Sequence, residues 1–294
     1  MSDGIFAVIY GPSKTGKSTA TGAAGANGLF IAQTGGLLPL KNFLGLENIK
    51  TAGAKDVEAA GTLVAQSAGK TPTIVVDDFS LLVESTVTEL EKKHSFGDMW
   101  RKLRQQVLFM RDSARYATSK GTHVFFNCHQ VPPKVSSGKR VRGGPKLPGQ
   151  LPEQFSAFAD VVARAEYEET AAPWKYLLRT GPHPDYIAGD RLGVLPDPAP
   201  MNLREALIAA GYDLPRPKGF EWMDKTADKL CELVLKNGLE DWRTTLQKAG
   251  KELAGKYDLR HVRWVLQDSL HRAVIQNAGE NILDQMFIDE QEQW

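Results

Sequence analysis

Cysteine is nearly absent from this sequence. Only Cys128 and Cys231 occur among 294 residues. Two cysteines so far apart form neither a disulfide framework nor a metal-ligand spacing, which argues against a small disulfide-rich scaffold and against a cysteine-ligated zinc domain. The scarcity of cysteine predicts a reducing compartment, which we expect to be the cytoplasm.

Net charge and long apolar runs are lacking as well. The 36 Lys and Arg residues nearly balance the 35 Asp and Glu residues, and the net charge is +1. This balance excludes a protein that coats nucleic acid with its whole surface, so any basic contact with nucleic acid must be local. No apolar run has the length of a membrane span, and the first residues lack the pattern of a signal peptide. We therefore expect a soluble protein without a membrane partner.

The sequence does contain a complete phosphate-binding loop. An apolar run over residues 5–10 leads into it, and small residues compatible with a helix follow. The loop consists of Gly11, Pro12, Ser13, Lys14, Thr15, Gly16, Lys17 and Ser18, with Thr19 next in the helix. Glycine lets the backbone turn successive N–H groups onto a phosphate, Lys17 adds a positive charge, and the Ser18 hydroxyl can hold Mg²⁺. The stretch predicts a nucleoside triphosphate site, and we expect ATP and Mg²⁺ as its ligands.

A second apolar stretch, residues 73–80, ends in Asp77 and Asp78. It looks like a Walker B strand, and we expect it to lie beside the strand that precedes the phosphate loop. There Asp77 can hold the water shell of Mg²⁺, together with Ser18. Two aspartates after a strand are also a common turn, which is the alternative interpretation.

A third apolar run, residues 123–127, ends in Cys128, His129 and Gln130. A polar side chain at such a strand tip can contact the γ-phosphate, so His129 and Gln130 are candidates for phosphate sensing. The alternative is a histidine that caps a turn. We expect Cys128 to be a packing residue, because no group that would activate its thiol can be placed near it.

Residues 131–152 are basic and rich in Gly, Pro and Ser, without an acidic or aromatic residue. The basic side chains are Lys134, Lys139, Arg140, Arg142 and Lys146. This composition predicts a mobile cationic loop that follows a DNA backbone without reading its sequence. A surface loop without function is the alternative.

The rest of the chain predicts an α/β core followed by helices. Apolar periodicity indicates helices at 18–26, 56–68, 96–119, 202–210 and 258–277, a strand at 29–32, a helix or strand at 155–163, and an antiparallel pair of 164–167 with 174–179. We expect residues 1–214 to form the core and residues 215–294 to form a helical module. The acidic tip of that module, residues 284–294, either frays or recruits a protein partner.

In this order, the motifs resemble RecA-like P-loop ATPases encoded by bacteriophages, an AAA-type nucleotide-binding group that includes single-strand-annealing and recombinase-like proteins. The resemblance covers roughly the first 200 residues. It rests on residues 11–19, on Asp77 and Asp78, on residues 96–98 before the long helix, on the tip 128–130 and on residues 144–149. It implies a RecA-like P-loop NTPase core with a mainly parallel sheet, in the cytoplasm of a bacterial host.

The resemblance also implies partners and roles. It implies a homo-oligomeric ring or filament, single-stranded DNA as a partner, and Arg191 as a finger that enters the nucleotide site of the next subunit. Two positions depart from the pattern. Gln33 and Thr34 stand where relatives carry a glutamate after the second strand, so Asp78 is the best substitute for water activation. Gly189 stands where relatives carry a lysine two residues before the finger.

The resulting hypothesis is a Mg²⁺-dependent, DNA-binding ATPase of phage recombination or replication, in which Lys17, Asp78, His129, Gln130 and Arg191 act on the phosphates. One alternative is a nucleotide or nucleoside kinase whose lid is the cationic loop. Another is an ATP-gated switch that holds DNA or a partner with little turnover, which the missing glutamate favours.

Overall fold

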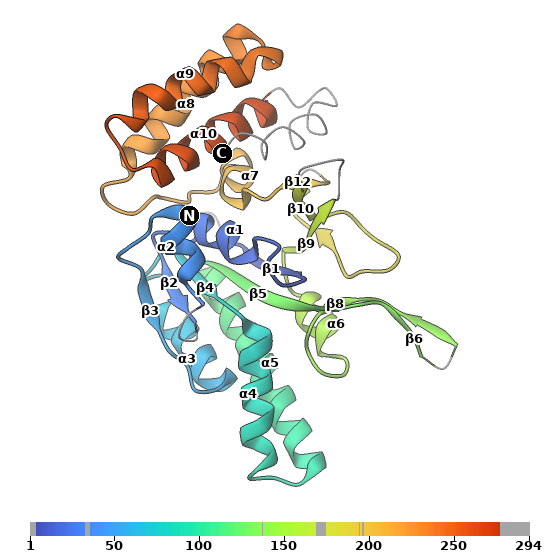
Figure 1. The fold of residues 1–294 in the computed structure, drawn as a ribbon. Helices are drawn as coiled ribbons and strands as arrows, with labels where there is room; N and C mark the ends of the chain where they lie inside the picture. Colours follow the sequence, from blue (N-terminus) through green and yellow to red (C-terminus); the bar gives the residue numbers. More distant parts are fainter. Residues whose placement is uncertain are drawn as a thin grey trace.

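The computed structural model describes residues 4–32, 36–136, 138–168, 175–193, 195 and 197–276. Within these residues a mainly parallel sheet carries helices on both faces (Figure 1). Its path is β12 (Ala199–Pro200), β10 (Lys175–Arg179), β9 (Val161–Glu168), β1 (Phe6–Gly11), β5 (His123–Val131), β4 (Thr73–Val76), β2 (Leu29–Ile31) and β3 (Lys50–Ala52). Two short strands, β8 (Gly144–Pro145) and β11 (Gly189–Asp190), pair with β5 and β9.

The strand that ends before Asp77 is separated from the phosphate-loop strand by one other strand. β5 lies between β1 and β4, so the prediction that these two are direct neighbours is wrong. Spatial order differs from chain order here, because a strand that comes later in the sequence inserts between two earlier ones. β5 pairs in parallel with both, with Gly11 opposite His129 and Val76 opposite Phe126. The carboxyl ends of all three strands therefore meet at one edge of the sheet.

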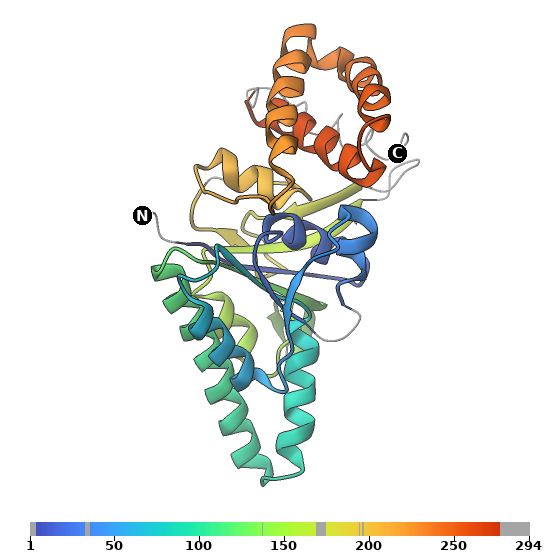
Figure 2. The same cartoon turned by 90° about the vertical axis from the view of Figure 1, so that its left-hand side faces the viewer.

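The two faces of the sheet bury different helices, as the alternation of side chains along β1 requires. Ala7 and Ile9 point into one hydrophobic cluster, whereas Phe6, Val8 and Tyr10 point into the other. The first cluster includes α1 (Lys17–Ala24), α2 (Leu38–Leu44) and α7 (Leu203–Ala209). The second includes α3 (Val57–Ser67), α4 (Phe79–Glu91), α5 (Phe96–Ser119) and α6 (Leu151–Ser156). Figure 2 shows α4 and α5 continuing beyond the sheet as a pair of long helices.

The expected fold class is confirmed as a mainly parallel α/β core followed by C-terminal helices. The predicted helix 96–119 coincides with α5, and β9 and β10 form the predicted antiparallel pair. Residues 131–152 differ from the mobile loop we expect. They form an antiparallel hairpin of β6 (Lys134–Ser136) and β7 (Lys139–Val141), then β8 on the sheet and a buried Leu147. Main-chain ladder bonds order this segment although it has few apolar side chains.

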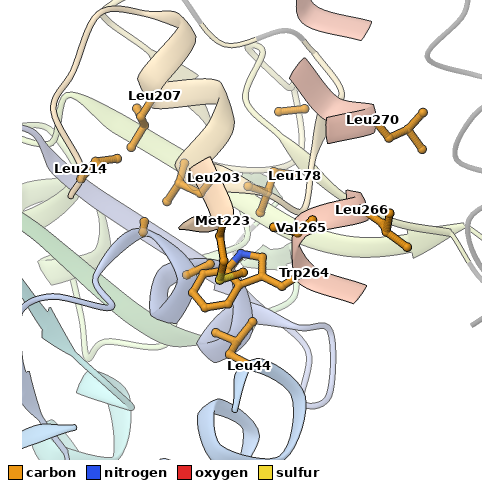
Figure 3. Packing of buried hydrophobic residues seen from close by; sticks show 14 of the residues in the cluster. Leu44, Leu178, Leu203, Leu207, Leu214, Met223, Trp264, Val265, Leu266 and Leu270 are labelled. Carbon is orange, nitrogen blue, oxygen red and sulfur yellow. The ribbon is translucent and has the colours of Figure 1, made fainter. Parts of the chain in front are cut away.

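Three C-terminal helices pack on the α2 and α7 side of the sheet. They are α8 (Glu221–Asn237), α9 (Trp242–Ala254) and α10 (Leu259–Gln276), with the 3₁₀ turn η1 (Leu239–Asp241) before α9. Trp264 and Met223 lie close to Leu44 of α2, within the same cluster as α1 (Figure 3). The division at residue 214 stays a prediction, and the tip 284–294 lies outside the described residues. Among the residues described, no helix is both long and apolar enough to cross a membrane.

Candidate nucleotide-binding site

The phosphate loop leaves β1 in a conformation that depends on its glycines. Gly16 has a left-handed φ of 79°, and Lys17 begins α1 directly after it. A Cβ on Gly11 would lie 2.3 Å from the carbonyl oxygen of Ala165 on β9, so no side chain fits there. Lys14 also has a positive φ, 64°, which non-glycine residues rarely adopt. The loop thus delivers the unpaired N–H groups of the first helical turn to the edge of the sheet.

Lys17 bends back over this loop. Its Nζ donates hydrogen bonds to the carbonyl oxygens of Gly11, at 3.2 Å, and Pro12, at 2.6 Å. Burial lowers the pKa of Lys17, and the carboxylates of Asp78 and Asp77 oppose that shift. A bound phosphate would offer this ammonium group negatively charged acceptors in place of the two carbonyl oxygens.

Asp77 joins the loop to the neighbouring strands. Its Oδ1 accepts hydrogen bonds from the Ser18 hydroxyl, at 2.9 Å, and from Asn127 Nδ2, at 2.7 Å. Asn127 Nδ2 also lies 2.8 Å from Thr21 Oγ1 on α1. Burial raises the pKa of Asp77, and the two hydrogen bonds counteract it. We did not predict a role for Asn127, although a single amide at the end of an otherwise apolar strand was a signal that could have found it.

Ser18 and Asp77 form a donor set that suits Mg²⁺. This ion is usually held by one or two protein oxygens together with substrate phosphates and water. Asn127 Oδ1, beside them, is buried and has no hydrogen-bond partner within the described part of the chain. The same part of the chain holds no cluster of three or more His, Cys, Asp or Glu that would bind a metal by itself. The residues therefore fit a metal that arrives with a nucleotide.

Asp78 and His129 meet at the tips of β4 and β5. Asp78 is the left-handed N-cap of α4, with φ 54°, and its Oδ1 accepts the Leu81 amide at 3.3 Å. The same oxygen lies 3.3 Å from His129 Nε2, and the His129 amide donates to Ser80 Oγ at 3.0 Å. Asp78 thus caps α4, and the charge of its carboxylate opposes the lowering of the Lys17 pKa by burial.

Gln130 and Cys128 point to the other face of the sheet. Gln130 Oε1 accepts a hydrogen bond from Arg164 Nε of β9 at 3.1 Å. The side chain of Arg164 also pairs with Glu166 and was not singled out from the sequence. Cys128 is fully buried, and burial raises the pKa of its thiol to about 12, which fits the expected packing role.

The predicted basic residues lie on and around the hairpin formed by β6 and β7, which projects from the molecule (Figure 1). Lys134 is exposed on it. Three others have acidic partners: Arg140 pairs with Asp185, Arg142 with Glu153 at 3.5 Å, and Lys146 with Glu84 at 2.6 Å. The side chain of Lys139 lies outside the described residues. Fewer positive charges of this segment are thus unpaired than its sequence indicates.

Arg191 lies at the opposite end of the sheet from the phosphate loop. Its amide donates to the carbonyl of Asp160, and the Asp160 amide donates to the carbonyl of Phe6 at the start of β1. Gly11, by contrast, ends that strand. Arg191 therefore does not join the nucleotide site of its own chain. Gln33 and Thr34, where the resemblance implies a glutamate, lie outside the described residues.

Comparison with known proteins agrees with this geometry. A family profile described as an AAA domain matches residues 3–192. No curated protein matches the chain significantly. Similar solved structures include the flagellar accessory protein FlaH of Methanocaldococcus jannaschii, at 14% identity and a TM-score of 0.39 over 61% of this chain and 78% of that one. A KaiC-like protein of Pyrococcus horikoshii OT3 gives 16% identity and a TM-score of 0.38 over 60% and 78%. Overlaps this weak transfer no function.

Proposed function

Because the chain belongs to the AAA domain family, we propose that it is a Mg²⁺-dependent, RecA-like ATPase that binds single-stranded DNA as an oligomer in phage recombination or replication. The observation that carries this proposal is the meeting of Lys17, Ser18 and Asp77 at the loop. These residues come from two elements and are joined by the 2.9 Å bond between Ser18 and Asp77.

The chemistry of this site is mainly charge stabilisation. The first-turn amides and Lys17 bind the phosphate oxygens and neutralise the charge that develops when the terminal phosphoryl group departs. Ser18 and Asp77 would hold Mg²⁺, which would supply further positive charge to those oxygens. Asp78 and His129 lie at the strand tips, where one of them can orient the attacking water. Arg191 can contribute only from a neighbouring copy, because it lies at the far end of its own sheet.

The decisive experiment measures release of labelled phosphate from ATP and Mg²⁺, with and without single-stranded DNA. We expect DNA-stimulated release, and we expect Lys17→Ala to lower it on the order of 100-fold, because a charged transition-state contact is lost. Lys41→Ala removes an exposed lysine on α2 and serves as the control. A wild-type protein that takes up no nucleoside triphosphate would overturn the proposal. A phosphorylated nucleoside formed from a panel of nucleosides would identify a kinase instead.

An ATP-gated switch is the second candidate. The Asp78 carboxylate is already engaged by the Leu81 amide and by His129, which leaves it less available to activate water. ATP retained in a 1:1 complex over hours, with turnover indistinguishable from a blank, would support the switch over the ATPase.

The DNA part of the proposal has its own test. Removing the charges of Lys139, Arg140 and Arg142 is expected to weaken binding to single-stranded DNA and to reduce the slope of log K against log salt by about 2, since each phosphate contact contributes about 0.7. The matched control removes Lys92 and Lys93, which directly follow α4, and Lys102 of α5. Equal slopes for both triple variants would exclude the hairpin as the DNA contact.

A further inference from the structure

We propose that Arg164 is a positioning residue that couples the phosphate loop to the β6–β7 hairpin, by holding Gln130 on one side and Tyr186 on the other. The coupling rests on the proposed nucleotide site, whereas the connection to the hairpin stands on the structure alone.

Arg164 lies on β9 directly beside the phosphate-loop strand, in register with Tyr10. Its side chain is 19% exposed. The Nε donates to Gln130 Oε1 at 3.1 Å, and the guanidinium carbon lies 3.8 Å from the centre of the Tyr186 ring. Glu166, which also pairs with Arg179, accepts from another nitrogen of Arg164. A planar guanidinium can stack and donate in this way at once, and a lysine cannot.

The contact with Gln130 fixes the end of β5, from which the chain enters the hairpin. Arginine only donates, so the oxygen of the Gln130 amide must face Arg164 and its NH₂ group must face away. Gln130 follows His129, which is in register with Gly11 of the loop. Its backbone pairs with Pro145 of β8, just past the hairpin. The orientation of this amide is therefore set by a residue outside the loop.

The contact with Tyr186 fixes the return of the hairpin. Gly143 follows β7 and forms a bridge with Tyr186. Its amide donates to the Asp185 carbonyl at 2.7 Å, and its carbonyl accepts the Ile187 amide at 2.9 Å. The Asp185 side chain pairs with Arg140 on β7 itself. Both ends of the hairpin are thus connected to one guanidinium.

The Tyr10 hydroxyl offers the Arg164 side chain an alternative hydrogen-bond acceptor. The Tyr10 hydroxyl is buried next to the loop and has no hydrogen-bond partner among the described residues. If an occupied loop shifts the end of β5, where Gln130 follows the register pair of His129 and Gly11, Arg164 loses an acceptor, and the Tyr10 oxygen can take its place. With two such hydrogen-bond arrangements of Arg164, a nucleotide bound at the loop would change how firmly Arg164 holds the hairpin.

The connection of Arg164 to both ends of the hairpin, which we call the tether, is tested first without nucleotide. Trypsin cleavage after Lys139 and Arg140 reports opening of the hairpin, since cleavage follows the population of the open form. We expect Arg164→Lys to accelerate cleavage at these bonds about tenfold, because a charge-assisted hydrogen bond and a ring stack are lost. Tyr186→Leu should accelerate it as well, and Tyr186→Phe should not. Arg111→Lys is the matched control, because Arg111 also stacks on a ring, Phe158, and pairs with a carboxylate, Asp112. Equal rates for Arg164→Lys and Arg111→Lys would overturn the tether.

The coupling is tested with a fluorophore on Val135→Cys, an exposed hairpin position, since Cys128 and Cys231 are buried. Non-hydrolysable ATP with Mg²⁺ should change the anisotropy of the label in the wild-type background. Arg164→Lys and Tyr10→Phe should bind the nucleotide with a Kd within about threefold of wild type and should lose most of the anisotropy change. A retained change in both variants, or loss of binding itself in Arg164→Lys, would overturn the positioning role. Absence of nucleotide binding in the wild type would refute the proposed function instead, and the trypsin result would still decide the tether.

Discussion

Asn127 keeps a carboxylate and a helix together at the centre of the nucleotide site. Its amide nitrogen bridges Asp77 on the β4 side to Thr21 on α1, at 2.7 and 2.8 Å. A neutral donor in this place satisfies Asp77 without adding charge next to Lys17. The side chain is 2% exposed, so water cannot replace it.

Replacing Asn127 by leucine should therefore lower stability as well as nucleotide affinity. We expect Asn127→Leu to reduce the free energy of unfolding by about 1–3 kcal/mol, because Asp77 loses a buried donor. Urea denaturation followed by tryptophan fluorescence measures the change. Asn237→Leu, which removes a partly buried bond to the neutral Thr245, is the control and should have a smaller effect. Equal losses would show that Asn127 is an ordinary structural amide.

His123 predicts how stability depends on pH. The buried imidazole accepts the Ile5 amide at Nδ1, over 3.1 Å, so it must be unprotonated there. Burial lowers its pKa below the ordinary 6.5, and Asp213 opposes the shift only in part. The unfolded chain therefore binds this proton more readily than the folded one. Its effect on stability is absent above the ordinary pKa and grows as the pH falls below it.

We expect the free energy of unfolding to decrease as the pH falls from about 7 to about 5. His123→Asn keeps an acceptor for the Ile5 amide but does not titrate in this range, so its stability should change less over the same interval. Urea titrations at several pH values check this. Parallel curves for the two proteins would mean that other groups cause the pH dependence.

At the scale of elements, β2 can approach β4 only because Gly28 has no side chain. A Cβ there would lie 2.0 Å from Thr73 Oγ1 and 2.3 Å from the Thr73 carbonyl oxygen. Backbone atoms of a central strand cannot move aside as the end of a long side chain can.

Gly28→Ala is thus expected to destabilise the protein by about 1–3 kcal/mol, because the strand must shift to admit a methyl group. Gly97→Ala is the control, since nothing lies within 4 Å of a Cβ in the first turn of α5. That change should be neutral or stabilising by up to about 1 kcal/mol. Thermal unfolding of both variants and of the wild type measures these changes. A Gly28→Ala protein as stable as the wild type would contradict the close contact.

The elements that follow from local pattern could be predicted, and those set by distant pairing could not. The long α5 has a regular apolar stripe, and the phosphate loop is contiguous in sequence. α4 was missed because Phe79 and Ser80 continue an apolar strand in sequence, whereas Asp78 caps a new helix in space. The lone amide of Asn127 could have marked it as a candidate, but its partner Thr21 is brought to it only by the strand order. Arg164 could not be assigned a role, because its partner Gln130 also reaches it only through that order.

At the scale of the whole molecule, a buried ion cluster joins the sheet side to the C-terminal helices. Arg204 and Glu205 of α7, Arg216, Asp224 of α8, and Asp268 and Arg272 of α10 form its pairs. Asp268 is fully buried and also accepts the Asn202 amide at 2.6 Å. Met201, the residue before Asn202, lies against Gly16 of the phosphate loop. Through Asn202, the ion cluster thus reaches the residue next to Met201, which contacts the phosphate loop.

We expect Asp268→Asn to destabilise the chain by about 3–5 kcal/mol, because Arg216 keeps its buried charge and loses a partner. Asp258→Asn, at an exposed pair with Arg260, should change stability little. Urea denaturation followed by tryptophan fluorescence and by circular dichroism measures both. If the two signals separate in Asp268→Asn, residues 215–276 unfold apart from the core, whereas an unchanged midpoint would contradict the role of the cluster.

The shared packing of α1 with the last helices has a consequence for how the protein is made. On the ribosome, Ala24 at the end of α1 precedes Leu259 at the start of α10 by 235 residues. At roughly 5–20 residues per second, the nascent chain waits about 10–50 s before the helix that covers this side has been synthesised. During that interval the apolar side of the unfinished domain is open to chaperones, and α1 lacks the cover that the later helices give to its cluster.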